Sequence, residues 1–287
     1  MSTLTSYNLS NRPSASSNTG LCIFRTDNNA IEVSDGTSWQ AYNSDGVLVP
    51  GVSNSFSGSF DGTDDWIGIG NLSNLNSATN FTISVWFKQL QSLETGMLLG
   101  GTGSNGIGMY PYSSGDFFVH AGMVGSLSAA MPDTDDFINA VVTRDASNTK
   151  LYFNGTLAAT VTSSTIPSTA GNSFRIGTYT HYASSLPELE GNIDEVAIWD
   201  ATTLDATNIL AIYNTGVPID LSSDVVNYDQ SSTLTHWYRL GDHASDTGSG
   251  GVANGNTITN IENAANPGTN DGSTINGTPS FSTTVPS

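Results

Sequence analysis

Apolar and polar residues alternate with a period of two along much of the chain, and this alternation predicts β-strands. In the segment 81–89, FTISVWFKQ, the odd-numbered residues from Phe81 to Phe87 are all apolar and share one face of the predicted strand. Trp86 lies on the more polar face, which predicts that this strand is covered on both sides. The segment is therefore expected to be a central strand of a sheet.

Turn signals separate further strands of the same kind. Asn154-Gly155 predicts a two-residue hairpin between strands at 150–153 and 156–161, because both residues tolerate positive φ. One short amphipathic helix is expected over 205–213, and Gly216 and Pro218 stop it. Other expected strands are 137–145, 173–178, 193–199 and 234–242. The chain is predicted to be all-β.

Composition agrees with that fold class and sets the number of domains. A chain of 287 residues with 11% charged residues predicts one large β domain plus a small appendage, and it argues against a disordered polyelectrolyte. The net charge of −19 repels phosphate backbones, so nucleic acid is excluded as a partner. The same excess of carboxylates favours divalent cations.

The number of cysteines and the length of the apolar runs indicate in which cellular compartment the protein is made. Cys22 stands alone, which leaves no intramolecular disulfide framework and no cysteine-based zinc site. The first 20 residues lack a basic start followed by an apolar core, and the longest apolar runs are too short to cross a bilayer. We therefore expect synthesis in a cytoplasm and no membrane insertion.

The first 50 residues differ from the remainder. Residues 1–20 are polar and are expected to form an extended arm, and residues 21–50 predict a small β-hairpin with strands at 21–25 and 30–34. A unit of this size buries too little apolar area to be stable alone. Residues 1–50 are thus expected to be an attachment region, and residues 51–287 the main domain.

Three segments of the main domain carry a family resemblance. They are FDGTDDWIGI at 60–69, KLYFNGTLAATV at 150–161 and GNIDEVAIWD at 191–200. Together they resemble the laminin-G-like, concanavalin-type jelly roll. The resemblance implies an all-β sandwich in which the opening and closing strands lie near each other. The segment 243–287 is rich in Gly, Asn and Thr with isolated apolar residues, and we expect it to wrap over the sandwich.

Two further strings resemble bacteriophage virion proteins. The pattern G-x-x-x-F-x-T-D-x-N-x-I-x-V-x-D-G-T-x-W begins at Gly20, and W-x-R-x-G-D begins at Trp237. The resemblance implies a structural protein on the virion surface, made in the host cytoplasm, as a head decoration or fibre or as a tail-fibre component. Residues 1–50 would then anchor it to capsid or tail proteins, and a homo-oligomer, with a trimer favoured, is expected.

A carbohydrate-binding module for host-surface glycans is the alternative function. Its candidate residues are Tyr110, Tyr112, Tyr179 and Tyr182, which we expect on loops, where their rings could stack on pyranose faces. The competing interpretation is that these aromatic rings only pack at the rim of the core.

A glucanase-like hydrolase is a third possibility, and the sequence disfavours it. Glycosidases on this scaffold place carboxylates on one strand in an E-x-D-x-x-E pattern, and no such string occurs. No G-x-S-x-G nucleophile motif is present, and the G-x-G-x-x-G string at 101–106 is not followed by a predicted helix. We therefore expect a protein that is not an enzyme.

Calcium is the cofactor that the resemblance implies. Laminin-G-like sandwiches often hold Ca²⁺ through carboxylate and backbone oxygens, and Asp61, Asp64 and Asp194 are the candidate ligands. The alternative is that Asp61 caps its own turn and Asp194 accepts hydrogen bonds from the backbone or an arginine.

Overall fold

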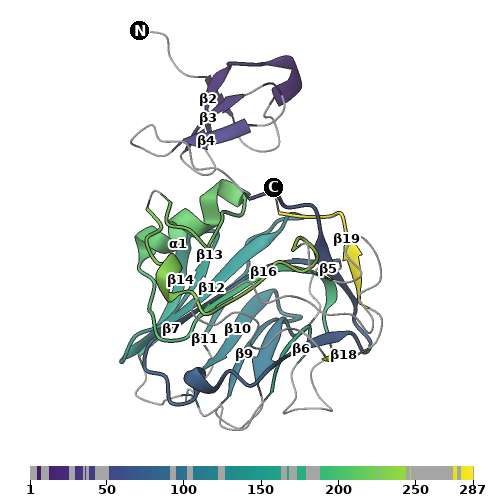
Figure 1. Cartoon of the computed structure of the whole chain (residues 1–287), viewed down its shortest axis with the longest axis vertical. Coiled ribbons are helices and arrows are strands. Elements are labelled where there is room, and N and C mark those ends of the chain that lie inside the picture. Colours follow the sequence, from purple (N-terminus) through teal and green to yellow (C-terminus); the bar gives the residue numbers. More distant parts are fainter. Residues whose placement is uncertain are drawn as a thin grey trace.

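Two antiparallel sheets, one of eight and one of seven strands, form the main body of the computed structural model (Figure 1). The structure describes residues 5–7, 13–25, 30–34, 36, 39–42, 52–90, 95–101, 106–121, 127–162, 167, 173–178, 188–225, 227–243, 246, 274–276 and 279–286. The prediction of an all-β, jelly-roll-like sandwich is confirmed.

The eight-stranded sheet runs in the order β14-β13-β12-β7-β16-β5-β19, and β17 pairs with β16 beside this path. Its strands are β5 (Ser57–Asp61), β7 (Phe81–Gln89), β12 (Ile138–Arg144), β13 (Asn148–Phe153), β14 (Thr156–Thr162), β16 (Glu190–Trp199), β17 (His236–Tyr238) and β19 (Ser280–Ser282).

The seven-stranded sheet runs in the order β11-β10-β9-β8-β15-β6-β18. Its strands are β6 (Trp66–Gly70), β8 (Leu99–Gly101), β9 (Ile107–Pro111), β10 (Asp116–Ala121), β11 (Leu127–Ala130), β15 (Phe174–Ile176) and β18 (Thr274–Asn276).

The main core lies between the two sheets. Phe81, Ile83, Val85 and Phe87 of β7 all point into it and are buried, as the alternation predicts. Phe117 of the opposite sheet lies 5.5 Å from Phe87 between ring centroids. The apolar faces of the two sheets thus supply one continuous core.

A second core covers the outer face of the eight-stranded sheet. Helix α1 (Ala206–Tyr213) and the segment that follows it pack over Val141, Tyr152, Ala197 and Trp199. Trp86 is also buried on this side and stacks on Tyr213 of α1 at 5.8 Å between ring centroids. The expectation that both faces of β7 are covered is therefore confirmed.

The N-terminal region forms a separate four-stranded sheet in the order β1-β2-β3-β4. Its strands are β1 (Thr5–Tyr7), β2 (Cys22–Arg25), β3 (Ala30–Ser34) and β4 (Trp39–Tyr42). Residues 5–7 of the expected N-terminal arm form strand β1, which is extended and pairs in parallel with β2. In Figure 1 this sheet lies beyond the end of the sandwich that carries α1.

The C-terminal segment returns to the sandwich. Strand β18 pairs with β6 at one edge of the seven-stranded sheet, and β19 pairs with β5 at one edge of the eight-stranded sheet. The described part of the chain contains no helix long and apolar enough to cross a membrane.

Candidate functional site

Four aromatic side chains gather on the outer face of strands β9 and β10. Alternation along these strands turns Ile107, Met109 and Phe117 into the core and leaves the intervening residues on the opposite face. We call the outward-facing group, Tyr110, Tyr112, Phe118 and His120, the aromatic patch.

Ring contacts hold the aromatic patch together. Tyr110 lies opposite Phe118 in the strand register and stacks on it at 5.7 Å between ring centroids. Tyr112 meets Phe118 edge to face at 5.4 Å. Both geometries are favourable arrangements of aromatic rings. The rings therefore form one surface and do not act as separate side chains.

A polar contact fixes the inner end of the patch. The Tyr110 hydroxyl and Nε2 of His120 share a hydrogen bond of 2.8 Å, and the two rings are stacked. Burial lowers the pKa of His120, which favours the neutral imidazole. The exposed fraction of Tyr110 is 6%, whereas that of Tyr112 is 40%. One end of the aromatic patch is therefore the buried, hydrogen-bonded pair of Tyr110 and His120, and the other end is the exposed ring of Tyr112.

A second aromatic and cationic pair lies farther across the same outer face. The guanidinium carbon of Arg175 lies 3.7 Å from the ring centroid of Trp66, a cation–π contact. Arg175 of β15 is opposite Gly68 of β6 and Gly100 of β8 in the register. Both neighbours are glycines, so neither contributes a side chain beside the arginine, and the carboxylate of Glu188 is near enough to act on its charge.

The structure brings together two of the four predicted carbohydrate-binding residues. Tyr110 and Tyr112 both belong to the aromatic patch, while Tyr179 and Tyr182 lie outside the described residues. The expectation that these rings lie on loops is wrong for Tyr110, which is part of β9. Sequence reasoning missed His120, although its alternation with Phe118 along DFFVHA carries the signal.

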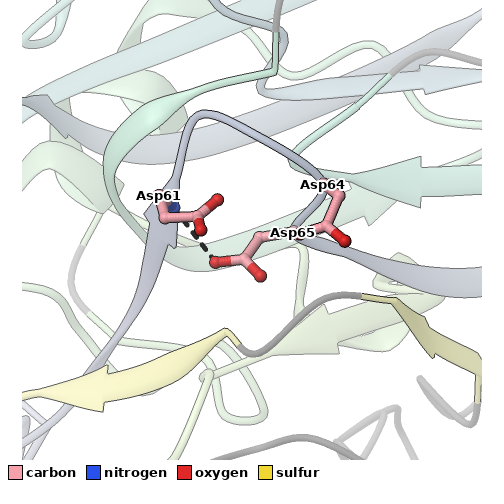
Figure 2. Close-up of side chains that lie close together, drawn as sticks. All are labelled: Asp61, Asp64 and Asp65. Carbon is pink, nitrogen blue, oxygen red and sulfur yellow. Dashed lines mark hydrogen bonds between the residues drawn. The ribbon is translucent and has the colours of Figure 1, made fainter.

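An acidic cluster lies at the turn between β5 and β6. One carboxylate oxygen from each of Asp61, Asp64 and Asp65 lies within 4.8 Å of the other two. Figure 2 shows the three side chains around the turn. Two hydrogen bonds from backbone N–H groups to carboxylates hold the turn. Thr63 N donates to Asp61 Oδ1 at 2.9 Å, and Asp61 N donates to Asp65 Oδ2 at 3.0 Å. The alternative that Asp61 caps its own turn is therefore confirmed, and the clustering exists beside it.

Glu188 adds a fourth carboxyl group to this region. Burial raises its pKa, and the nearby carboxylates of Asp64, Asp61 and Asp65 raise it further. Its Oε2 atom is buried without a hydrogen-bond partner. Three clustered carboxyl groups, with the buried Oε2 of Glu188 in the same region, are oxygen ligands of the kind that calcium prefers. The residues present therefore fit a calcium ion.

Asp194 lies apart from the acidic cluster. Asp61 pairs with Glu190 in the register of β5 and β16, whereas Asp194 pairs with Trp86 of β7, four residues farther along β16. The expectation that Asp194 joins Asp61 and Asp64 at one ion is therefore not met. Asp65 lies beside Asp61 and Asp64 in its place. Sequence reasoning missed Asp65, although it directly follows Asp64 in the string DGTDD.

The surroundings of Asp194 explain its position. The register of β16 shifts between Asp194 and Ala197, and Glu195 adopts φ 47° there. In a regular strand, Asp194 would share a face with Val196 and Ile198. Because of the bulge, Asp194 lies on the outer face of the sheet, beside Trp86. Asp194 accepts hydrogen bonds from Asn54 Nδ2 at 2.9 Å and from Glu195 N at 2.8 Å.

Burial dominates the electrostatics of this bulge. It raises the pKa of Asp194 well above its usual range, and the adjacent Glu195 adds to the effect. Burial also raises the pKa of Glu195 to about 7, although the Arg239 guanidinium acts in the opposite direction. The bulge is thus a buried polar junction that ties residue 54 and the segment after β17 to the sheet.

Comparisons with known proteins agree with this architecture. The family model described as the concanavalin A-like lectin/glucanases superfamily matches residues 61–210, more than half of the chain. No curated protein matches the chain by sequence.

One solved structure shows the same fold at low sequence identity, and others are similar over part of the chain. A candidate carbohydrate-binding protein from Bacteroides ovatus superposes with a TM-score of 0.53 at 16% identity, over 80% of this chain and 60% of that protein. The chain therefore spans less than two thirds of that relative. The SAP-like pentraxin of Limulus polyphemus gives a TM-score of 0.45 at 16% identity, over 56% of this chain and 83% of the pentraxin. The CBM40 of a Ruminococcus gnavus sialidase gives 0.44 at 15% identity, over 54% of this chain and 95% of the module.

Proposed function

The chain belongs to the concanavalin A-like lectin/glucanases superfamily, and on that premise we propose that it is a carbohydrate-binding module that acts without catalysis. The observation that carries the proposal is the aromatic patch, because a connected aromatic surface with one open ring lies on the outer face of a sheet. A ligand site of this kind needs apolar rings for contact and a few fixed polar groups for orientation.

The patch supplies both kinds of group. The ring of Tyr112 is open enough to stack on the apolar face of a pyranose, and its edge-to-face contact with Phe118 holds it in place. The Tyr110 hydroxyl and the His120 imidazole, joined by their hydrogen bond, offer a donor and an acceptor to sugar hydroxyls. A sugar that lies on the patch would meet an apolar surface at one end and a polar pair at the other.

The carboxylates near the patch support binding without hydrolysis. A glycosidase needs two carboxyl groups across the scissile bond, about 5 to 9.5 Å apart. Strands β8 to β11 carry a single carboxylate, Asp116, and it accepts a hydrogen bond of 2.9 Å from Ser114 Oγ. A lone carboxylate held in this way supplies no second catalytic group.

A polysaccharide panel tests both halves of the proposal. The protein is incubated with β-glucans, agars and capsular polysaccharides, and bound protein and released reducing ends are measured in the same samples. Binding to at least one polymer without release of reducing ends is expected. Release of reducing ends that Glu190→Gln or Glu195→Gln abolishes would show that the protein is an enzyme.

Calcium is part of the proposal as a structural cofactor. Asp61, Asp64, Asp65 and Glu188 would hold the ion, which would supply positive charge among carboxylates that otherwise repel one another. The side chains of this chain do the rest: the Asp61 and Asp65 hydrogen bonds shape the turn before the ion binds.

Attachment to a bacteriophage virion is the second candidate role. The observation that favours it is the segregation of β1–β4, whose sheet pairs with neither sandwich sheet in the described part of the chain. Such a unit suits anchoring to capsid or tail proteins, with glycan binding by the sandwich at the virion surface. Deletion of residues 1–50 should then abolish incorporation into particles while the sandwich stays folded, and normal incorporation of the truncated protein would contradict the role.

A further inference from the structure

The hairpin that joins β9 to β10 places a carboxylate beside the open ring of the aromatic patch. Two backbone hydrogen bonds close the loop, from Tyr112 N to Asp116 O at 2.8 Å and from Gly115 N to Tyr112 O at 2.9 Å. Gly115 adopts φ 87°, the left-handed conformation that a hairpin loop of this kind needs just before the returning strand. Asp116 therefore lies opposite Tyr112 across the hairpin.

Alternation along β10 puts Asp116 on the same face as the aromatic patch. Phe117 points into the core, so Asp116 and Phe118 both lie on the outer face of the sheet. Phe118 is the residue that meets the Tyr112 ring edge to face. The carboxylate of Asp116 thus lies at the exposed end of the patch.

One oxygen of this carboxylate is available to a ligand. Oδ2 of Asp116 accepts a hydrogen bond of 2.9 Å from Ser114 Oγ, whereas Oδ1 accepts none from the part of the chain that the structure describes. The side chain is half-buried. The serine therefore orients the carboxylate, and Oδ1 is left for a donor that comes from outside the protein.

The charge around the patch favours a cationic ligand. The segment 89–143, which contains β8 to β11, has five acidic residues and no Lys or Arg. Met131 N donates to Gly115 O at 2.9 Å, which brings the loop after β11 to the same hairpin. A surface of this kind attracts cations and repels anionic sugars. Three of the acidic residues are exposed in that loop: Asp133, Asp135 and Asp136.

We propose that the aromatic patch binds a polysaccharide that carries free primary amines, such as a chain of de-N-acetylated hexosamines. A sugar ring lies on Tyr112, and its ammonium group donates a hydrogen bond to Asp116 Oδ1. The inference rests on the proposed carbohydrate-binding function and names the substrate class of the same site.

The other groups of the patch are compatible with a charged amine. An ammonium group near the face of a tyrosine ring is attracted by the electrons of that ring. Burial lowers the pKa of His120, so its imidazole stays neutral in mildly acidic solution and does not repel the cation. No cationic side chain of β8, β9, β10 or β11 competes for Asp116, because these strands contain neither Lys nor Arg.

Two forms of one ligand test the proposal. A chitosan oligosaccharide is compared with the same oligosaccharide after re-N-acetylation, which converts each charged amine into a neutral amide. Affinities are measured by calorimetry in mildly acidic buffer at physiological salt, which screens general attraction to the net charge of −19. We expect the amine form to bind about tenfold more tightly than the acetylated form.

Asp116→Asn tests the role of the carboxylate in that preference. The variant keeps the shape of the side chain and can still accept from Ser114, but it should reduce the ratio of the two affinities by about threefold or more. The matched control is Asp220→Asn. Asp220 is also half-buried and accepts from Ser222 Oγ at 2.6 Å, but it lies in the segment after α1, on the opposite side of the sandwich. The control should keep the wild-type ratio.

Each failure of the test has its own meaning. Equal affinity for the two forms, or tighter binding of the acetylated form, would overturn the preference for amines and leave carbohydrate binding intact. Binding of the amine form that neither Tyr112→Ala nor Asp116→Asn weakens would show attraction to net charge alone, and it would also overturn the proposal. If neither form binds while the polysaccharide panel identifies another polymer, only this inference is wrong. If no polymer binds at all, the proposed function is wrong as well.

Discussion

Arg239 donates a hydrogen bond from Nε to Oε1 of Glu195 at 2.9 Å, and both side chains are buried. Trp237 Nε1 donates to the other carboxylate oxygen, and Arg239 Nη2 donates to the carbonyl oxygen of Ser53. These hydrogen bonds join the bulge of β16 to the residue that follows β17 and to Ser53, which precedes the first strand of the sandwich. They therefore connect three segments that are far apart in the sequence.

Removal of the arginine should therefore be costly. Arg239→Met leaves the Glu195 carboxylate buried without its cation, and loss of one partner of a buried pair typically destabilises a protein by about 3–5 kcal/mol. We expect a loss approaching this size in the free energy of unfolding, measured by urea denaturation above the Glu195 pKa of about 7, where the carboxyl group is ionised in the wild type. Lys88→Met, which removes a cation from a half-buried site, is the control and should cost much less. Equal losses in the two variants would contradict the role of the pair.

Asp194→Asn should stabilise the protein at neutral pH. The Asp194 carboxyl group is fully buried beside Glu195, and an asparagine at this position removes a charge whose desolvation is unfavourable. Turnover of the Asn54 amide keeps one hydrogen bond between the two side chains. The new side chain could still accept from Glu195 N, as Asp194 does at 2.8 Å. A gain of about 1 kcal/mol in the free energy of unfolding is expected at pH 7.

The pH dependence of that gain has a definite sign. Because the pKa of Asp194 is raised in the folded state, the ionised carboxyl group destabilises the protein increasingly as pH rises above the unfolded value of 3.8. The advantage of Asp194→Asn should thus grow with pH and shrink toward pH 4, in denaturation experiments over that range. A gain that is larger at low pH would contradict the burial of this group.

Asp205 caps helix α1, and its removal gives a prediction of opposite sign. Its Oδ1 accepts from Asn208 N at 2.8 Å, and this contact lowers the pKa of Asp205. Asp205→Ala should cost about 1 kcal/mol in the free energy of unfolding. The cost should be present above the unfolded pKa of 3.8 and fade as pH falls below it. Asp133→Ala, at an exposed site, is the control and should have little effect at any pH.

Calcium should raise the melting temperature of the wild-type protein. An ion that binds only the folded state stabilises it by about 2.7 kcal/mol at a hundredfold excess over the dissociation constant. Asp64→Asn combined with Glu188→Gln should abolish the response, whereas Asp194→Asn should retain it, because Asp194 lies outside the acidic cluster. Identical melting with calcium and with chelator, and no metal by elemental analysis, would rule out the ion.

Strong local signals made the strands predictable from the sequence. The alternation of β7 and the Asn154-Gly155 turn are properties of neighbouring residues. The structure has β7 and the hairpin of β13 and β14 where these patterns predict them. The bulge at Glu195 has no such signal. Glu195 in the bulge accepts hydrogen bonds from Trp237 and Arg239, more than 40 positions later, and a local pattern contains no trace of such contacts.

The candidate sites were predictable in part for the same reason. Asp61 and Asp64 are close in the sequence and belong to one turn, so their proximity followed from local geometry. The approach of Glu188 to that turn depends on the packing of distant segments. Likewise, Tyr110 and Tyr112 were identified as aromatic residues, but their contact with Phe118 and His120 required the pairing of β9 with β10.

The affinity for a polysaccharide that the panel identifies, measured by calorimetry, tests the proposed function most directly. Wild type, Tyr112→Ala and the control Leu90→Ala are compared, because both residues are exposed and only Tyr112 belongs to the aromatic patch. Loss of the stacking ring should weaken binding by about tenfold in Tyr112→Ala, while Leu90→Ala binds as the wild type does. Equal affinity in all three proteins, or no binding to any polysaccharide, would contradict a carbohydrate-binding role for this face.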